Sequence, residues 1–190
     1  MPNIVWTTVY FCGNDKNQIE KAHNEINEAL KDNKDSEISS ILKCGTQSGS
    51  YLRVVGKIQK YKNKFFYFPV FSEDVWEPHL SAYLEYAEKN NFWIEFFSED
   101  LSSEFFIKFG QNLCTAEYIV DCYHKQKKET TSRLFKNEED LFKFCKRLTS
   151  EPIENINDVF ILFEKINEKK NTNTYVLYKA EEASPEDFTS

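Results

Sequence analysis

Short runs of β-branched and aromatic residues, separated by polar segments, recur along this chain and decide what it can fold into. Thirty of the 190 residues are aromatic and seventeen of these are Phe, so rings must fill most of any core. Runs of this length, bounded by Gly, Asn or charged residues, are typical of β-strands. The predicted strands cover residues 4–13, 51–59, 64–71, 91–97, 104–110, 116–125, 158–166 and 174–180.

Three segments between these runs have apolar residues at helical spacing. The first follows Gly13, with Asn14 or Asp15 as its cap, and the third follows the cap Asn137. The second lies within residues 71–88 and begins either with Asp74 as cap or with Pro78 in the first turn. The predicted buried positions are Ile19, Ala22, Ile26, Ala29 and Leu30 in the first helix, Trp76, Leu80, Tyr83, Leu84 and Ala87 in the second, and Leu141, Phe144, Cys145 and Leu148 in the third.

The order of these elements predicts an α+β fold, a mostly antiparallel sheet with helices packed on one face. The runs over 91–97, 104–110 and 116–125 follow one another through short connections and predict a meander. No long linker interrupts the chain, so we expect a single domain over residues 1–182 and a flexible tail over 183–190.

Composition restricts the class of protein. No apolar run reaches the roughly eighteen residues of a membrane span, and the N-terminal segment lacks the basic flank of a signal peptide. The five cysteines are odd in number and widely spaced, unlike a disulfide framework. We therefore expect a soluble cytoplasmic protein with reduced thiols and no contact with membranes.

The acidic residues are concentrated in the middle of the chain. Residues 65–107 contain nine acids and one base, whereas the rest contains 22 acids and 23 bases. The same segment holds fourteen of the thirty aromatic residues. The net charge of −7 argues against direct nucleic-acid binding, which normally requires a basic face. An acidic, aromatic segment instead favours a basic protein partner.

Three sequence features together resemble a known family. The N-terminal Met1-Pro2-Asn3 leads into a strand that ends at Gly13, Trp76-Glu77-Pro78 opens a helix, and a meander follows. The chain resembles, over about residues 1–14 and 64–125, the YubB-like proteins encoded on plasmids and phages. The resemblance implies a ferredoxin-like part over about residues 51–125, followed by a helix and hairpin over 126–182, and a mobile-element origin. It implies no catalytic residues.

Few side chains suggest chemistry. Cys122 and His124 could form an activated thiol pair, but residues two apart on a strand are separated by about 6.5 Å along the backbone, so a buried Cys and a strand-end His are favoured. Adding Cys114 would give a metal set with loose spacing and no Cys-x-x-Cys pair. We expect no catalytic residue, no metal and no cofactor.

The aromatic strands are apolar on both faces, so the second face of the sheet is either covered or open to a partner. Covering is favoured, and the C-terminal helix and hairpin are the candidate cover.

The leading hypothesis is a non-catalytic protein of a phage or mobile element that binds and inhibits a basic, nucleic-acid-processing host defence protein. The alternatives are a ferredoxin-like module that stacks single-stranded nucleic acid on sheet aromatics, and a small Cys/His enzyme. The expected partner-binding residues are Glu85, Glu88, Trp93, Glu95, Phe97, Glu99, Asp100 and Glu104.

Overall fold

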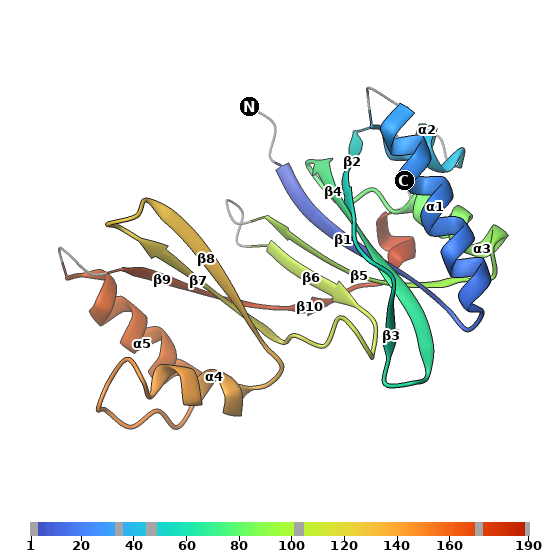
Figure 1. Cartoon of the computed structure of the whole chain (residues 1–190). Helices are drawn as coiled ribbons and strands as arrows, with labels where there is room; N and C mark the ends of the chain where they lie inside the picture. The colour runs from blue at the N-terminus through green and yellow to red at the C-terminus, as the bar shows by residue number, and fades with distance from the viewer. Residues whose placement is uncertain (1–3, 33–35, 45–48, 101–104, 170–172, 189–190) are drawn as a thin grey trace. The chain divides into compact units, whose positions relative to one another are not determined.

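The chain forms two compact units, which are seen in the computed structural model of Figure 1. Unit 1 comprises residues 1–114 and 182–190, and unit 2 comprises residues 115–181. Each unit has its own hydrophobic core, in place of the single domain expected over residues 1–182. The structure describes residues 4–32, 36–44, 49–100, 105–169 and 173–188.

Unit 1 is built on a seven-stranded sheet with the order β10-β6-β5-β1-β4-β2, and β3 also pairs with β4. All pairings among β1 to β6 are antiparallel. The aromatic runs form most of these strands, as the sequence predicts. The strands are β1 (Ile4–Gly13), β2 (Ser50–Val55), β3 (Gln59–Tyr61), β4 (Phe65–Val75), β5 (Trp93–Asp100), β6 (Phe105–Phe109) and β10 (Glu181–Glu182).

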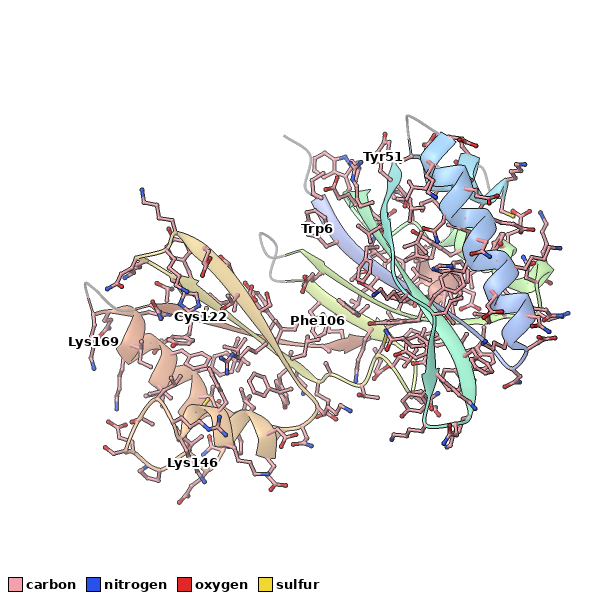
Figure 2. All side chains as sticks on the ribbon, in the orientation of Figure 1. Trp6, Tyr51, Phe106, Cys122, Lys146 and Lys169 are labelled. Carbon is pink, nitrogen blue, oxygen red and sulfur yellow. The ribbon has the colours of Figure 1, made fainter. Side chains whose placement is uncertain are left out.

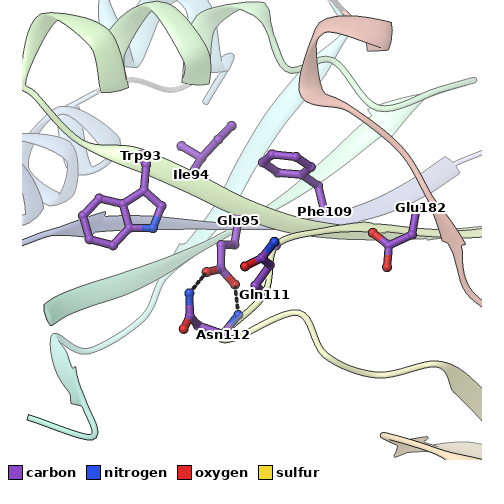
Figure 3. Close-up of a pocket in the computed structure, with 8 residues that line it drawn as sticks. Trp93, Ile94, Glu95, Phe109, Gln111, Asn112 and Glu182 are labelled. Atoms are coloured by element: carbon purple, nitrogen blue, oxygen red, sulfur yellow. Dashed lines mark hydrogen bonds between the residues drawn. The ribbon is translucent and has the colours of Figure 1, made fainter. Parts of the chain in front are cut away.

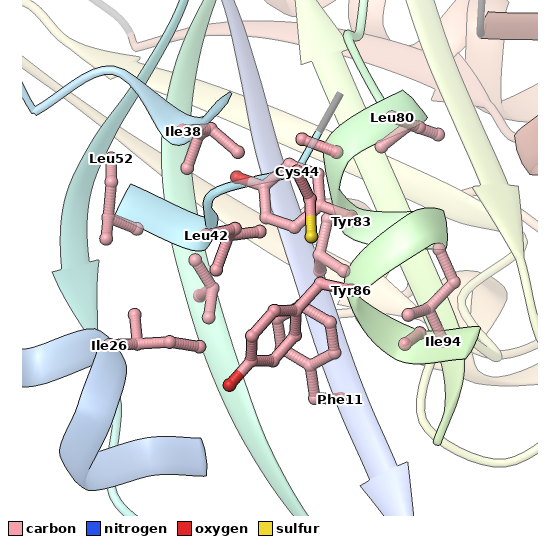
Figure 4. Packing of buried hydrophobic residues seen from close by; sticks show 14 of the residues in the cluster. Phe11, Ile26, Ile38, Leu42, Cys44, Leu52, Leu80, Tyr83, Tyr86 and Ile94 are labelled. Carbon is pink, nitrogen blue, oxygen red and sulfur yellow. The ribbon is translucent and has the colours of Figure 1, made fainter. Parts of the chain in front are cut away.

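Three helices complete the core of unit 1: α1 (Lys16–Asp32), α2 (Ile38–Leu42) and α3 (Ser81–Lys89). The α1 stripe of Ile19, Ala22 and Ile26 is buried, as its spacing predicts. At the centre of the core the Phe11 ring lies 5.4 Å from the Phe68 ring, as measured between centroids. Figure 4 shows Tyr83 and Tyr86 of α3 beside Phe11, and their ring centroids lie 6.0 and 5.5 Å from that of Phe11. A fully buried Phe side chain contributes roughly 1.5–3 kcal/mol, so these rings anchor the helices to the sheet.

The segment of residues 71–88 differs from the expectation at its start. Strand β4 continues to Val75, and α3 begins only at Ser81. Asp74 therefore lies in the sheet, opposite Val5, and does not cap a helix. Trp76 follows the strand with a φ of 74° and is 66% exposed, so the prediction that it is buried was wrong. The local capping pattern is overridden because the β1 and β2 ladders hold this segment extended.

Unit 2 contains a three-stranded sheet of order β8-β7-β9 and two helices. Its elements are β7 (Tyr118–His124), β8 (Glu129–Phe135), α4 (Glu138–Cys145), α5 (Ile156–Asn167) and β9 (Thr174–Lys179). The third strand of the expected meander, β7, thus belongs to a separate sheet. Residues 158–166 were expected to form a strand but lie within α5. A capping box between Asn155 and Asp158 starts this helix, and Val159, Leu162 and Phe163 form its buried stripe.

The tail was expected to be flexible from residue 183 onward. Its described part instead packs on unit 1 and forms the short helix η1 (Pro185–Phe188). The Leu80 N–H donates to the Phe188 carbonyl at 3.1 Å, and the Phe188 ring lies 6.3 Å from that of Phe96. In the part of the chain that the structure describes, no helix has the length and apolar character needed to cross a membrane.

Candidate partner-binding surface

The sheet of unit 1 has two faces with different surroundings. Successive residues of a strand point to opposite faces, so in β1 the buried Val9 and Phe11 face the helical core. Ile4, Trp6 and Tyr10 therefore point to the opposite face, which we call the open face. Thr8 points to the same face, and the register places Phe71 of β4 opposite Thr8 and Val54 of β2 opposite Phe71. On the other side of β1, the β5 residues opposite Trp6 and Thr8 also lie on the open face.

One end of the open face exposes a contiguous set of large apolar side chains, the apolar patch: Ile4, Trp6, Val54 and Phe71. Their exposed fractions are 38%, 47%, 53% and 38%. Phe71 lies opposite Val54 of β2 on one side and opposite Thr8 of β1 on the other. Thr8 is two residues from Trp6 on the same strand. Figure 2 places Trp6 and Tyr51 at this end of the sheet. Contiguous exposed apolar side chains of this kind mark interaction sites more often than scattered ones do.

An ion pair borders the apolar patch. Glu73 lies opposite both Trp6 and Tyr51 in the ladders. The Arg53 Nε donates to Glu73 Oε2 at 2.7 Å, and its Nη2 donates to the same oxygen. The guanidinium carbon also lies 5.7 Å from the centroid of the Tyr51 ring. Arg53 is thus held by both neighbours and carries no unpaired charge at this border.

The other end of the open face is aromatic but less accessible. The Tyr10 ring lies 5.9 Å from that of Tyr67 and 6.4 Å from that of Phe97. The Phe65 ring contacts Trp93 edge-on at 5.0 Å. Burial raises the pKa of Tyr10 and keeps its hydroxyl protonated. These rings pack mainly on one another, so the accessible apolar area belongs to the patch.

The structure divides the residues predicted to bind a partner. Trp93, Phe97 and Glu99 lie on the open face, where Glu99 is opposite Trp6. Glu85 and Glu88 lie on α3, on the opposite side of the sheet, and Glu85 pairs with Lys89 within that helix. The side chain of Asp100 and the whole of Glu104 lie outside the described residues.

Glu95 does not belong to an exposed docking surface, because it is only 2% exposed. Its Oε2 accepts hydrogen bonds from the backbone N–H groups of Asn112, Leu113 and Cys114 at 3.1, 2.6 and 3.3 Å. Its Oε1 accepts from the Asn112 side chain at 2.8 Å. Four donors occupy the carboxylate, which therefore clamps residues 112–114 to β5.

A pocket of about 440 Å³ adjoins this Glu95 clamp, and Figure 3 shows its lining. Trp93 and Phe109 form apolar walls, while Glu182 is paired with Lys108 at 3.0 Å. Gly110 has a φ of 128°, and a Cβ on it would lie 2.5 Å from Glu95 Cγ. The turn thus needs glycine so that the chain can approach the carboxylate, which indicates a structural role for this region.

A second buried carboxylate lies on the helical side of the sheet. Asp74 accepts hydrogen bonds from Thr7 Oγ1 and, at 2.5 Å, from Ser50 Oγ, and Thr7 is also 2.9 Å from Ser98 Oγ. Burial raises the pKa of Asp74, while the bonds from Ser50 and Thr7 act in the opposite direction. With an exposure of 0%, this group is enclosed in the core and not presented to a substrate.

Cys122 and His124 are closer than their backbone spacing suggests. The Cys122 Sγ lies 3.8 Å from His124 Nδ1, and His124 Nε2 lies 2.9 Å from Thr131 Oγ1. Cys122 is only 7% exposed, so an external substrate has little access to the thiol. Cys114 belongs to unit 1, and burial raises the pKa of its thiol. Within the described ranges, no three His, Cys, Asp or Glu side chains form a potential metal site.

The members of the apolar patch cannot be identified from the sequence alone. Ile4 and Trp6 lie in a run that was correctly predicted as a strand, but its two faces could not be assigned. The alternation of Trp6, Thr8 and Tyr10 with Thr7, Val9 and Phe11 was the available signal, and it is ambiguous because both sets contain aromatic residues.

Comparisons with models of protein families, with curated proteins and with solved structures find no match to this chain.

Proposed function

We propose that this protein is a non-catalytic binding protein that docks a partner protein on the apolar patch of unit 1. The observation that carries the proposal is the exposure of Trp6, which is 47%, next to exposed Phe71 and Val54. Large aromatic side chains are enriched at protein interfaces because each of them buries much area with few rotatable bonds.

The charges around the patch favour a basic partner protein over a nucleic acid. The cations on the open face in strands β1, β2, β4, β5 and β6, within the described residues, are Arg53 and Lys108, and both are ion-paired. A phosphate backbone needs available cations for its affinity. Unit 1 also contains 19 acidic and 12 basic residues, whereas unit 2 contains 12 of each. The net negative charge thus belongs to the unit with the patch, where it would attract a basic surface.

The fold supports a more specific assignment. We infer that β1-α1-β2-β4-α3-β5 is a ferredoxin-like arrangement with its helices on one face, because these four strands lie in the order β5-β1-β4-β2. Together with the resemblance to YubB-like proteins, this favours a phage or plasmid origin. A basic, nucleic-acid-processing defence protein of the host then fits as the partner, inhibited by occupation of its basic surface. The five free cysteines are consistent with a cytoplasmic location.

Photo-cross-linking tests the position of the interface. The photoreactive residue p-benzoylphenylalanine replaces Trp6 in one variant and Phe160 in a matched control, and both are produced in the native host cells. Phe160 is 48% exposed and lies on α5 of unit 2, so the two probes are similarly accessible. We expect position 6, and not position 160, to cross-link to one discrete basic protein.

Binding to the purified partner then provides the decisive measurement. Trp6→Ala and Phe71→Ala should each weaken the affinity at least about tenfold, as removal of a central aromatic anchor typically does, and Phe160→Ala should not. Glu99→Lys should slow association and reduce the effect of added salt. Cross-linking of position 6 to RNA or DNA would favour the stacking module, and equal labelling from both positions would exclude the patch as the interface.

A further inference from the structure

The outer edge of β8 is uncovered, whereas most strand edges in proteins are protected from pairing with another chain. Among the strands that the structure describes, β8 pairs with β7 alone. Six of its seven residues are exposed, and the strand contains neither Pro nor Gly. An edge of this length presents backbone N–H and C=O groups that can pair with another strand.

The other edges of the two sheets are short or occupied. At the β9 edge, Asn167 donates to the Tyr175 carbonyl at 2.8 Å and accepts from its N–H at 2.7 Å. At the β2 edge, the Leu52 N–H donates to the Ser36 carbonyl at 2.7 Å, and Glu37 forms a bridge with Tyr51. Strands β3 and β10 have three and two residues. Within the described residues, β8 is therefore the long edge without a cover.

The charges of β8 are complementary to those of a second, antiparallel copy. If Thr131 faces Thr131 of the other chain, Glu129 faces Arg133 of that chain, and the two-fold axis repeats this pair. Glu129, Thr131 and Arg133 alternate along the strand, so all three lie on the same face. Opposite charges directly across a strand pair are stabilising, whereas like charges are destabilising.

We propose that β8 pairs with β8 of a second copy of this chain, so that the two three-stranded sheets join into one of six strands. A two-fold axis perpendicular to the sheet keeps the helices α4 and α5 of both copies on the same side. The β-branched Thr130 and Thr131 favour the extended conformation at the centre of the pair. The proposal concerns unit 2 and is independent of the apolar patch.

The nearby contacts of the charged side chains are compatible with this pairing. The Arg133 guanidinium lies 5.2 Å from the centroid of the Phe144 ring, a contact with a neutral side chain that leaves its charge available to a carboxylate. Glu129 lies 3.3 Å from Lys127, and both are about half exposed or more. Such an exposed pair is weak and can be exchanged for a cross-strand pair of similar strength.

Charge exchange across the proposed pair provides the test. The molar mass of the wild type, Glu129→Arg and Arg133→Glu is measured by light scattering coupled to size-exclusion chromatography over a wide concentration range. Each single variant would place two like-charged pairs across its own interface. We expect dissociation constants of the dimer on the order of tenfold higher than that of the wild type. Mixing the variants restores both opposite-charge pairs, so the mixture should form a heterodimer of wild-type strength.

A matched charge reversal on the opposite edge of the same sheet, Lys179→Glu at the exposed end of β9, should leave the dimer unchanged. Circular dichroism of each variant verifies folding, and rescue by mixing excludes misfolding as the cause of a lost dimer. A wild type that stays monomeric at all concentrations would overturn the proposal. So would a dimer that is insensitive to both reversals, a pair of variants that mixing does not rescue, or a dimer lost through Trp6→Ala.

Discussion

Replacing Glu95 with Ala tests the conclusion that this carboxylate is a structural clamp and not a docking residue. The change removes the acceptors of four hydrogen bonds and leaves the N–H groups of residues 112–114 without a partner. A hydrogen bond to a charged group contributes about 1.5–3 kcal/mol. The loss of four such bonds is partly offset, because the variant no longer has to desolvate a buried charge.

The adjacent pocket of about 440 Å³ reduces the effect further, since water can reach the freed N–H groups. We therefore expect the free energy of unfolding of unit 1 to fall by about 3 kcal/mol. Because 1 kcal/mol corresponds to roughly 3 °C in a domain of this size, the melting temperature should fall by about 10 °C. Guanidinium unfolding measures the free energy, and hydrogen exchange of the amides at 112–114 should accelerate most.

Two variants separate the clamp from a general effect of removing negative charge. Glu95→Gln keeps the shape and one carbonyl acceptor, so it should destabilise less than Glu95→Ala. Glu88→Ala removes an exposed carboxylate of α3 and should change stability by no more than about 0.5 kcal/mol. If Glu95→Ala is as stable as Glu88→Ala and the amides of residues 112–114 remain equally protected, Glu95 is not a structural clamp.

Trp76→Ala should change the free energy of unfolding by less than about 0.5 kcal/mol in thermal melts, because the ring is 66% exposed; a loss of about 3–5 kcal/mol would mean that it is buried. Burial raises the pKa of Asp74 in the folded state. Protonation of Asp74 therefore stabilises the fold at a pH below its unfolded-state pKa of about 3.9, and this stabilisation is lost as the pH rises through the folded-state pKa. Asp74→Asn should flatten that part of the curve of stability against pH, and an unchanged curve would contradict the raised pKa. Asn155→Ala should cost about 1 kcal/mol in urea unfolding, because the Asn155 side chain accepts hydrogen bonds from two backbone N–H groups at the start of α5; an unchanged midpoint would show that the cap is dispensable.

The sequence predicted those elements whose local pattern and tertiary environment agree. Strand β1 and helix α1 are examples, because Ile19, Ala22 and Ile26 both follow helical spacing and meet an apolar sheet. The run of residues 158–166 contains Val, Ile and Phe, which favour strands, but the capping box and the buried stripe at positions 159, 162 and 163 select a helix. Strand β8 was missed because its exposed sequence has no alternating apolar pattern.

The candidate surface was harder to predict, since it depends on which face each strand turns to the core. Glu95 and Glu99 are four residues apart on one strand and on the same face, yet only Glu95 is covered, by the turn that contains Gly110. That cover involves residues fifteen or more positions away in the sequence. The local sequence around Asp74 likewise fits a helix cap. Its pairing with β1 and β2 shows that it is a buried strand residue.

The discontinuity of unit 1 has a consequence for the order in which the protein can fold during synthesis. Residues 182–188, which contribute a partner for Lys108 and the Phe188 contacts with Leu80 and Phe96, are translated after all of unit 2. The domains of a protein usually fold in the order in which they emerge from the ribosome. Unit 1 therefore cannot complete its structure before the end of the chain is available, although most of its own chain emerges before unit 2 does. A released chain truncated after residue 181 should therefore contain a protease-resistant unit 2 and a unit 1 that is more readily cleaved.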